Sequence, residues 1–347
     1  MIDGLNKLIE EAVKEGIFPG ANYSLIVKGK KYFGSFGAKA LLPIKEENSL
    51  DTLYDMASVS KVLSTTTCAM LLLERGLLRL DDLVITYLPE FKQPEITIWD
   101  LMTHSSGLPP IVPGFQDKDK KAIIETIYNI ETKYPKNTQI IYSCVGYIVL
   151  GFVIEKITGQ TLDVFAKENI FKPLDMQDTF YNPKDVKRCA TTEQRGDKFD
   201  RGYVHDEVCN ILDGRAGNSG VFSTVKDMAN FMEMILNNGK FKNQTYFSKP
   251  VIDLLFTSQI EEPNHLSKRT SKRGLGWILQ GRYSPSGDLA SANTIMHTGF
   301  TGTHLFIDKD NQIAFCLLSN RVHPSRDNNK IIAWRAKVGN YIIGQMA

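Results

Sequence analysis

The sequence lacks the features of a membrane-spanning or nucleic-acid-binding protein. Its 41 lysines and arginines nearly balance 39 aspartates and glutamates, and with no long basic run nothing points to nucleic acid. No apolar stretch approaches the roughly 18 uncharged residues of a membrane span, since the best one, residues 69–73, is far too short. The N-terminus has no basic segment followed by an apolar run, so we expect no signal peptide.

Cysteine is scarce and scattered. The five cysteines are odd in number and show neither a disulfide framework nor zinc spacing. They are Cys68, Cys144, Cys189, Cys209 and Cys316. No His-Glu-x-x-His or Cys-x-x-Cys pattern occurs, and the glycine-rich segment 214–220 lacks the Gly-Lys-Ser/Thr of a phosphate-binding loop. We therefore expect a reduced, cytoplasmic protein that uses neither a metal nor another cofactor.

What is present is an ordinary globular composition, with 42% apolar and 23% charged residues. The length allows one large domain or two lobes with a sizeable core. One short basic cluster stands out, and we interpret it as a solvated loop. It consists of Lys268, Arg269, Lys272 and Arg273.

The pattern of apolar residues predicts strands near both ends of the chain and helices between them. Strands are expected at 23–27 and 31–36, joined as a hairpin, and again at 277–279, 304–307 and 312–318. Helices are expected at 6–14, 59–75, 98–103, 121–128, 146–157, 227–236 and 329–343. We therefore predict an α/β (α+β) fold with a sheet built from both termini and a helical insertion.

A Ser-x-x-Lys element, Ser58 to Lys61, stands at the start of the long apolar helix predicted over 59–75. Residues three apart share one helix face, so the lysine can reach the serine hydroxyl. The helix N-terminus favours negative charge developing on oxygen. Burial should lower the pKa of Lys61 and leave an amine that accepts the serine proton. This spacing predicts a serine nucleophile.

The same pattern occurs a second time, from Ser223 to Lys226. Here Thr224 is followed three residues later by Asp227, the signature of a helix N-cap. We interpret the second copy as a structural helix start.

Further segments match one family in order along the chain. They are Leu78-Arg79-Leu80-Asp81-Asp82, Tyr87-Leu88-Pro89, Leu101-Met102-Thr103-His104-Ser105-Ser106-Gly107-Leu108-Pro109, Tyr142-Ser143-Cys144-Val145-Gly146-Tyr147, Gly217-Asn218-Ser219-Gly220-Val221-Phe222-Ser223-Thr224 and His297-Thr298-Gly299. With Ser58 and Lys61, the chain resembles the β-lactamase-related serine hydrolases from about residue 5 to 340. That family includes class C β-lactamases, DD-peptidases, D-aminopeptidases and family VIII esterases.

The resemblance implies one β-lactamase/transpeptidase-like domain over residues 1–347. An antiparallel sheet flanked by terminal helices would form an α/β lobe of about 1–75 and 214–347. Residues of about 76–213 would form a mostly helical lobe, and Ser58 would lie between the two.

Tyr142 matches the tyrosine of the family's Tyr-x-Asn element, although Tyr128 and Tyr147 are equal to it by residue type. By resemblance, its phenol would exchange protons with Ser58 and with the leaving group. Cys144 stands where the family has asparagine. Its weak donor would not replace an amide that ties the lysine and a substrate carbonyl.

His297-Thr298-Gly299 occupies the family's Lys-Thr/Ser-Gly element. A lysine there binds a substrate carboxylate, whereas the imidazole of His297 is mostly neutral at pH 7, so we expect weaker carboxylate binding. The resemblance places the oxyanion hole at the amides of Ser58 and Phe300, with Gly299 letting the backbone approach the substrate.

Two further histidines are interpreted as structural. His104 lies in the segment that braces the helical lobe near the site in the family. His205 and Asp206 lie in a segment that resembles a loop leading toward the cleft, and we read them as loop architecture.

The resemblance implies a hydrolase that forms an acyl-enzyme on an ester, amide or β-lactam, with a small acyl compound as its partner and an oligomeric state left open. Because Cys144 and His297 both depart from the family pattern, we expect simple esters to react faster than penicillins. The alternative is a non-catalytic relative that binds peptide or peptidoglycan-like ligands.

Overall fold

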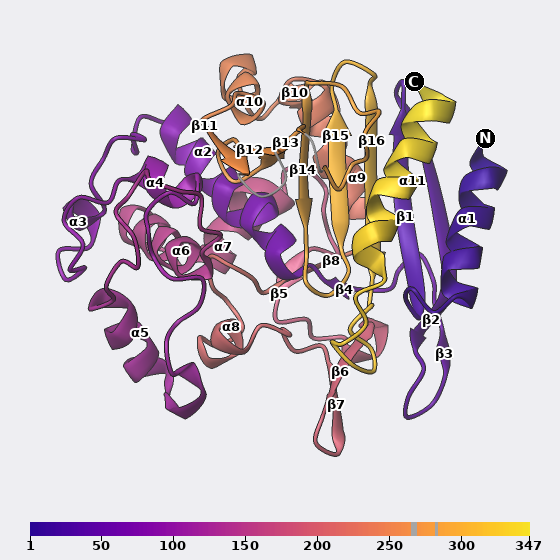
Figure 1. Cartoon of the computed structure of the whole chain (residues 1–347), viewed down its shortest axis with the longest axis horizontal. Helices are drawn as coiled ribbons and strands as arrows, with labels where there is room; N and C mark the ends of the chain where they lie inside the picture. The colour runs from indigo at the N-terminus through magenta and orange to yellow at the C-terminus, as the bar shows by residue number, and fades with distance from the viewer. Residues whose placement is uncertain (265–268, 282–283) are drawn as a thin grey trace.

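In the computed structural model, residues 1–264, 269–281 and 284–347 are described, and a nine-stranded antiparallel sheet dominates one side (Figure 1). Its order is β11-β12-β13-β14-β15-β16-β1-β2-β3. The strands are β1 (Gly20–Val27), β2 (Lys30–Ala40), β3 (Glu46–Glu47), β11 (Ile260–Asn264), β12 (Arg269–Arg273), β13 (Ile278–Leu279), β14 (Thr294–Thr298), β15 (His304–Asp308) and β16 (Ile313–Ser319). The N-terminal β1 pairs with the C-terminal β16, so the prediction of a sheet built from both ends is confirmed.

The predicted N-terminal hairpin is confirmed. β1 and β2 pair antiparallel, and Lys28 and Gly29 make the turn with left-handed φ values of 47° and 80°. The strand predicted at 277–279 is shorter than expected. The carbonyl oxygen of Trp277 accepts a hydrogen bond from Gly274, which places Trp277 in the preceding turn.

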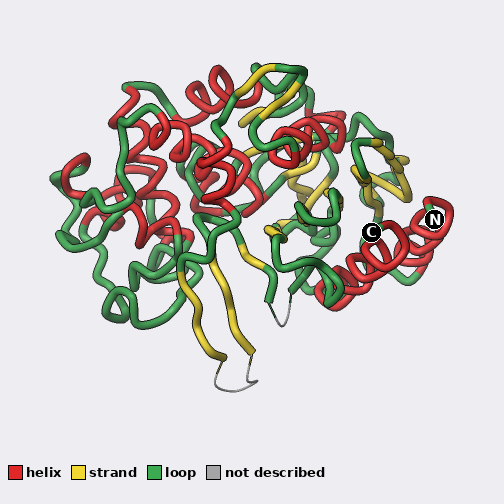
Figure 2. Tube along the Cα trace, turned by 90° about the horizontal axis from the view of Figure 1, so that it is seen from above, coloured by secondary structure: helices red, strands yellow, loops and turns green. Residues whose placement is uncertain are grey.

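Helices cover both faces of the sheet. α1 (Ile2–Lys14) and α11 (Ile331–Met346) lie side by side on one face, as Figures 1 and 2 show, and α9 (Val225–Leu236) lies against β1 and β16 on the other. Phe18 and Trp334 meet edge to face at 5.3 Å in the core beneath the terminal helices. All three helices were predicted from the sequence, at 6–14, 227–236 and 329–343.

Helices of the middle of the chain gather at the other side of the molecule (Figure 1). They are α2 (Thr67–Glu74), α3 (Val84–Tyr87), α4 (Ile98–Met102), α5 (Lys120–Tyr128), α6 (Cys144–Thr158), α7 (Leu162–Ala166) and α8 (Glu207–Ile211), with the short helical segments η3 (Phe115–Asp117) and η4 (Lys167–Phe171). The 3₁₀ turn η5 (Val186–Arg188) instead contacts β2, because the Lys187 carbonyl accepts from Lys39 Nζ. The division into two lobes near residues 76 and 213 stays a prediction. None of the helices in the described ranges is long and apolar enough to cross a membrane.

Short strands connect these two parts. β4 (Tyr54–Asp55), β8 (Val221–Ser223) and β5 (Phe180–Tyr181) form a small sheet. The remaining elements are the hairpins β6 (Thr191–Arg195) with β7 (Lys198–Arg201) and β9 (Lys240–Phe241) with β10 (Gln244–Thr245), and helix α10 (Lys249–Leu255).

The predicted helix over 59–75 is helical but not a single α-helix. It begins as the 3₁₀ turn η1 (Ala57–Val59), continues as the π-helix η2 (Lys61–Thr66) and only then becomes α2. The threonine run explains the irregularity: Thr67 Oγ1 bonds the Val62 carbonyl at 2.7 Å, and Thr65 Oγ1 bonds the Gly217 carbonyl at 2.7 Å. Such side-chain bonds compete with regular helical bonding.

Candidate active site

Ser58 lies in η1, immediately after the chain leaves β4. The preceding residue, Ala57, has a left-handed φ of 46°, a strained conformation for a residue with a Cβ atom. Ser58 is half-buried, while Lys61 is fully buried. Lys61 Nζ lies 3.1 Å from Ser58 Oγ, so the structure brings the predicted pair into hydrogen-bond contact.

The Lys61 amino group has two further partners. Its Nζ donates to the main-chain oxygen of Asn218 at 2.9 Å and lies 3.5 Å from Cys144 Sγ. Burial acts to lower the pKa of Lys61, but the negative charge that Cys144 and Tyr142 can carry, with a hydrogen bond to Tyr142, raises it above the usual lysine range. The direction of this shift opposes the neutral resting amine expected from the sequence, which stays a prediction. Cys144 and Tyr142, both distant along the chain, act against the effect of burial.

Tyr142 is the tyrosine that the structure places beside this pair. Lys61 Nζ lies 5.0 Å from the centroid of its ring. The Tyr147 hydroxyl is buried between Thr66 Oγ1, at 3.1 Å, and the Met102 carbonyl oxygen, at 3.5 Å. The Tyr147 ring also lies 5.7 Å from Lys61 Nζ, but its hydroxyl is engaged by Thr66 and Met102, so Tyr142 remains the predicted partner of Ser58.

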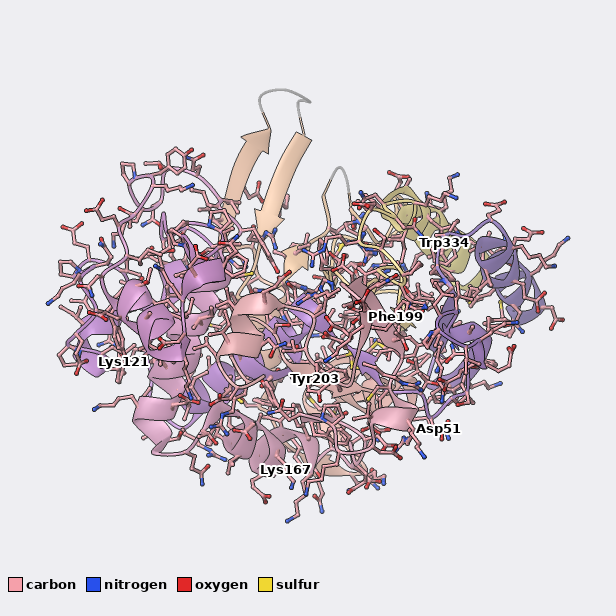
Figure 3. The ribbon with its side chains drawn as sticks, turned by 90° about the horizontal axis from the view of Figure 1, so that it is seen from below. Asp51, Lys121, Lys167, Phe199, Tyr203 and Trp334 are labelled. Atoms are coloured by element: carbon pink, nitrogen blue, oxygen red, sulfur yellow. The ribbon has the colours of Figure 1, made fainter. Side chains whose placement is uncertain are left out.

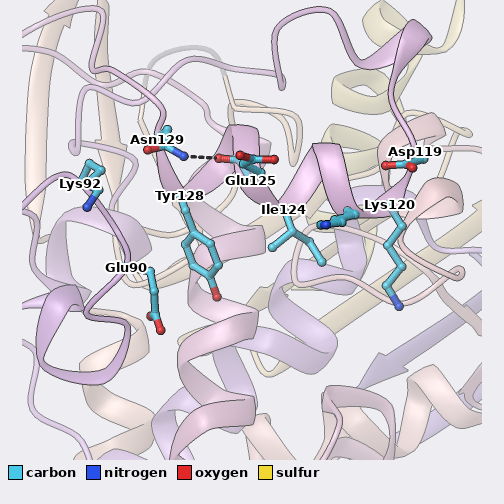
Figure 4. Close-up of a pocket in the computed structure, with 9 residues that line it drawn as sticks. Glu90, Lys92, Asp119, Lys120, Ile124, Glu125, Tyr128 and Asn129 are labelled. Carbon is cyan, nitrogen blue, oxygen red and sulfur yellow. Dashed lines mark hydrogen bonds between the residues drawn. The ribbon is translucent and has the colours of Figure 1, made fainter.

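Tyr128 lies elsewhere. It lines a depression with charged residues of α5 and of the loop at Glu90 and Lys92 (Figure 4). None of the predicted site residues lines that depression. Among the described residues, no group of three or more His, Cys, Asp or Glu side chains could hold a metal ion.

Cys144 is the first residue of α6, and its thiol faces Lys61. It is half-buried, whereas the other four cysteines are buried. The Lys61 contact gives the thiol a position beside the nucleophile, but it is much longer than a normal hydrogen bond to oxygen.

His297 is buried at the end of β14. Its Nδ1 lies 3.0 Å from the Thr298 carbonyl oxygen, so Nδ1 carries the proton and Nε2 is left as a buried acceptor without a partner among the described residues. Burial, with the charges of Lys61 and Arg273, holds the pKa of His297 well below its usual range. This agrees with the prediction of a neutral ring.

Gly299 and Phe300 follow in the turn between β14 and β15. A Cβ atom on Gly299 would lie 2.6 Å from the Met56 carbonyl oxygen, so only glycine allows this turn to approach the loop before the nucleophile. The amides of Ser58 and Phe300, the two expected oxyanion donors, donate no hydrogen bond to a described residue. Both remain free for a substrate.

The Phe300 side chain is 47% exposed and held by its neighbours. The Arg321 guanidinium lies 4.4 Å from the ring centroid, and its Nε donates to the Phe300 carbonyl at 2.8 Å. The His205 ring stacks on Phe300 at 5.5 Å. His205 therefore contacts the site through Phe300, from the loop that carries the exposed Tyr203 (Figure 3).

His104 supports Tyr142. It adopts a left-handed φ of 61°, accepts a hydrogen bond from the Ser143 amide at 3.1 Å and lies 4.6 Å ring to ring from Tyr142. These contacts brace the segment before α6.

Arg273, at the end of β12, is the residue that the sequence interpretation missed. Its guanidinium lies 5.7 Å from the centroid of the Tyr142 ring, and its Nε and Nη1 atoms are buried without a hydrogen-bond partner. Among the described side chains, which do not include those of residues 262–271, no carboxylate pairs with it. The neighbouring Lys272 pairs with Glu261, but it lies in strand β12 and not in the expected loop. For Arg273 that interpretation is wrong, because the strand alternation turns its side chain inward.

The second Ser-x-x-Lys copy shows no such constellation. Ser223 is buried in β8 and its Oγ lies 2.8 Å from Thr179 Oγ1, while Lys226 is exposed. Thr224 caps α9 by accepting from the Asp227 amide. The predicted structural helix start is confirmed.

Comparison with known proteins gives consistent results. The model of the family described as Beta-lactamase matches residues 5–340. The chain is 31% identical to an N-acetylmuramyl-L-alanine amidase of Bacillus subtilis, over 92% of this chain and 80% of that protein. It is 30% identical to an Escherichia coli O157:H7 protein provisionally named D-alanyl-D-alanine carboxypeptidase, over 98% of this chain and 88% of that protein.

A solved structure shares the fold. It is an octameric penicillin-binding protein homologue from Pyrococcus abyssi, with a TM-score of 0.73 and 21% identity over 97% of this chain and 77% of that chain. The expected β-lactamase/transpeptidase-like architecture is thereby confirmed.

Proposed function

Because the chain belongs to the β-lactamase family of serine hydrolases, we propose that it forms an acyl-enzyme through Ser58 on an ester, amide or β-lactam substrate. The observation that carries this proposal is the contact of Lys61 Nζ with Ser58 Oγ at 3.1 Å beneath Tyr142. A ligand-binding module has no need of a serine, a lysine and a tyrosine in this arrangement.

The resting charge of Lys61 determines the direction of proton movement. A charged ammonium donates to Ser58 Oγ and cannot accept its proton. We propose that the Lys61 charge stabilises Tyr142 as a phenolate, which is the acceptor. The Ser58 oxygen attacks the carbonyl carbon while its proton moves to the phenolate oxygen, and the negative charge passes to the carbonyl oxygen. The same proton then passes to the leaving group as the bond to it breaks.

The free amides of Ser58 and Phe300 supply the second element of the reaction. When the carbonyl becomes tetrahedral, its oxygen carries a negative charge that two backbone N–H groups stabilise. Water then attacks the acyl-enzyme, releases the acid and returns the Ser58 hydroxyl.

Arg273 defines the substrate class more closely. The Nε and Nη1 atoms of Arg273 are buried without a partner among the described side chains, and an anionic group of the substrate would offset the cost of burying them. Arg273 thus supplies the cation that His297 does not. The neutral His297 on β14 led us to expect weak binding of a substrate carboxylate, but we now propose that Arg273 on β12 binds it. A carboxylate near the scissile bond also fits the relative named as a carboxypeptidase.

The acyl-enzyme is tested by intact mass spectrometry after exposure to an activated ester, a penicillin and a fluorophosphonate. We expect a single adduct that peptide mapping places on Ser58. The alternative function, non-catalytic ligand binding, predicts no adduct with any of the three. An adduct on Cys144 or Ser223 would contradict the assigned nucleophile.

The role of Arg273 is tested with two esters that have the same acyl group and differ only in the leaving group. One leaving group is lactate, which carries a carboxylate, and the other is lactamide, which carries a neutral amide in its place. We expect the wild type to prefer the carboxylate, and Arg273→Met to lose that preference by about 10- to 100-fold, the worth of one charge-assisted hydrogen bond. Lys272→Met is the matched control, since Lys272 is the adjacent cation but pairs with Glu261. An unchanged preference in Arg273→Met would refute the carboxylate site.

Cys144 keeps its part in the expected substrate preference. Without an amide at this position, a penicillin loses a contact to its side-chain amide, so we propose that esters without such a side chain react faster. Cys144→Asn should narrow the gap by improving the penicillin. Equal rates on esters and penicillins in the wild type would contradict this proposal.

A further inference from the structure

Asp55 joins three separate segments of the chain next to the nucleophile. Its Oδ1 accepts a hydrogen bond from the Ala57 amide at 2.8 Å, and its Oδ2 accepts one from the His205 amide at 2.6 Å. Its main-chain oxygen accepts a third from Thr301 Oγ1 at 2.7 Å. One residue therefore connects the turn before Ser58, the loop between β7 and α8, and the turn between β14 and β15.

Two of these segments carry the free amides of the candidate site. Ala57 directly precedes Ser58, and Thr301 directly follows Phe300. The third segment reaches Phe300 as well, because the His205 ring stacks on the Phe300 ring with an interplanar angle of 25°. Asp55 thus touches the immediate supports of both oxyanion donors without touching the substrate position itself.

A second bond strengthens the same junction. Thr303 Oγ1 donates to the Met56 carbonyl oxygen at 2.9 Å. Gly299 presses against this stretch closely enough to exclude a side chain. The two turns are therefore fixed to each other along residues 55–57, and Asp55 is the only member of the contact that uses a charged group.

The charge of Asp55 needs an explanation, because the residue is 2% exposed and no cation among the described residues forms an ion pair with it. Burial raises the pKa of Asp55 to about 6. An asparagine would avoid the buried charge, but it has one acceptor oxygen, and its amino group would face the second N–H. Only a carboxylate can accept from the Ala57 and His205 amides at once.

We propose that Asp55 is a positioning residue that sets the separation and orientation of the Ser58 and Phe300 amides around the substrate oxyanion. The inference rests on the proposed function, since an oxyanion forms only if Ser58 attacks a carbonyl.

Asp55→Asn tests the inference, and Asp227→Asn is its matched control. Asp227 is also buried, accepts from the Asp178 amide and from Thr179 Oγ1 at 2.8 Å each, and has a pKa raised to about 6, but it lies at the start of α9. The substitutions are compared in ester turnover and in affinity for phenylboronic acid, which forms a tetrahedral adduct on a reactive serine.

We expect Asp55→Asn to lower kcat by about 10- to 100-fold, approaching the loss of one oxyanion donor, with KM changed less than about twofold. Affinity for the boronic acid should fall by the same factor, because the adduct also needs both amides. Asp227→Asn should leave kcat and boronic acid affinity unchanged, even where it alters the melting temperature.

Thr301→Val keeps the inference testable if Asp55→Asn fails to fold. It preserves size and removes only the hydrogen bond to Asp55, so we expect a fall in kcat of about 3- to 10-fold at unchanged KM. Wild-type kcat in a folded Asp55→Asn overturns the inference, as does an equal loss in Asp227→Asn. With Asp55→Asn unfolded, wild-type kcat in Thr301→Val overturns it. A wild type that forms no Ser58 adduct overturns the proposed function as well, which separates the two failures.

Discussion

The two Ser-x-x-Lys copies have the same sequence pattern but differ in secondary structure and in the contacts of their side chains. They are also neighbours, because Tyr54 of β4 pairs with Ser223 of β8. In the first copy the serine and the lysine both lie in the continuous helical segment that starts at Ala57, and their side chains meet. In the second copy the serine ends a strand, the helix begins only after Thr224, and Lys226 points to solvent.

The difference shows what the spacing requires. A separation of three brings two side chains together only when both residues are already helical. The left-handed Ala57, held by Asp55, starts the helix one residue before Ser58, whereas Thr224 starts α9 one residue after Ser223. The position of the helix start, not the motif itself, separates the proposed nucleophile from the residue that precedes a helix cap.

The strongest test of the difference between the two copies is to replace each serine in turn. Ser58→Ala should abolish ester turnover, with a loss of up to about a millionfold, because members of such a catalytic unit act together. Ser223→Ala should retain turnover and lose only its contact with Thr179. Steady-state rates and fluorophosphonate labelling measure both. Equal losses in the two variants would mean that the copies are not functionally distinct.

The lysines provide the second test. Lys61→Met should cost about ten-thousandfold in kcat, because the proposed proton transfer from Ser58 to Tyr142 would lose the positive charge beside it. Lys226→Met changes an exposed side chain and should leave kcat within about twofold. The control for folding is the far-ultraviolet circular dichroism spectrum of each variant. Residual turnover close to wild type in Lys61→Met would assign the proton transfer to other groups.

The smallest expected effect is a change in the pH dependence of stability, caused by Asp227, which follows the second copy at the start of α9. The pKa of Asp227 is raised to about 6, so the folded state binds this proton more tightly than the unfolded chain does. The wild type should therefore gain stability relative to Asp227→Asn as the pH falls from 7 to about 4.5, by about 1–3 kcal/mol. Urea unfolding at the two pH values measures the difference.

The same pH dependence of stability in the wild type and in Asp227→Asn would contradict this prediction. Asp55, next to the first copy, allows a second test, since it is also buried and its pKa is also raised to about 6. The wild type should also gain stability relative to Asp55→Asn as the pH falls. Asp55→Asn should in addition lose catalytic activity, which Asp227→Asn should not.

The sequence allowed the local parts of this structure to be predicted. Apolar periodicity identified the hairpin around Gly29 and the terminal helices, and the Ser-x-x-Lys spacing identified the pair Ser58 and Lys61. These features depend on residues close together in the chain, where spacing and backbone preference act directly.

The features that were missed depend on distant partners. Arg273 stands in a basic cluster like any exposed arginine, and only the sheet turns it toward Tyr142. Asp55 has no recognisable motif, because its partners at His205 and Thr301 are far along the chain. The upward shift of the Lys61 pKa depends on Cys144 and Tyr142, which tertiary packing brings to it.

The pairing of β1 with β16 has a consequence for synthesis. At about 5–20 residues per second, the ribosome completes β16 roughly 15–60 s after β1. Ser58 emerges early, but the turn that carries Phe300 follows only with β14 and β15. A growing chain that has not yet reached β15 therefore lacks the second amide of the proposed oxyanion site, so we expect no hydrolysis by it. The order of the strands along the chain therefore delays completion of the proposed site until β14 and β15 have been synthesised.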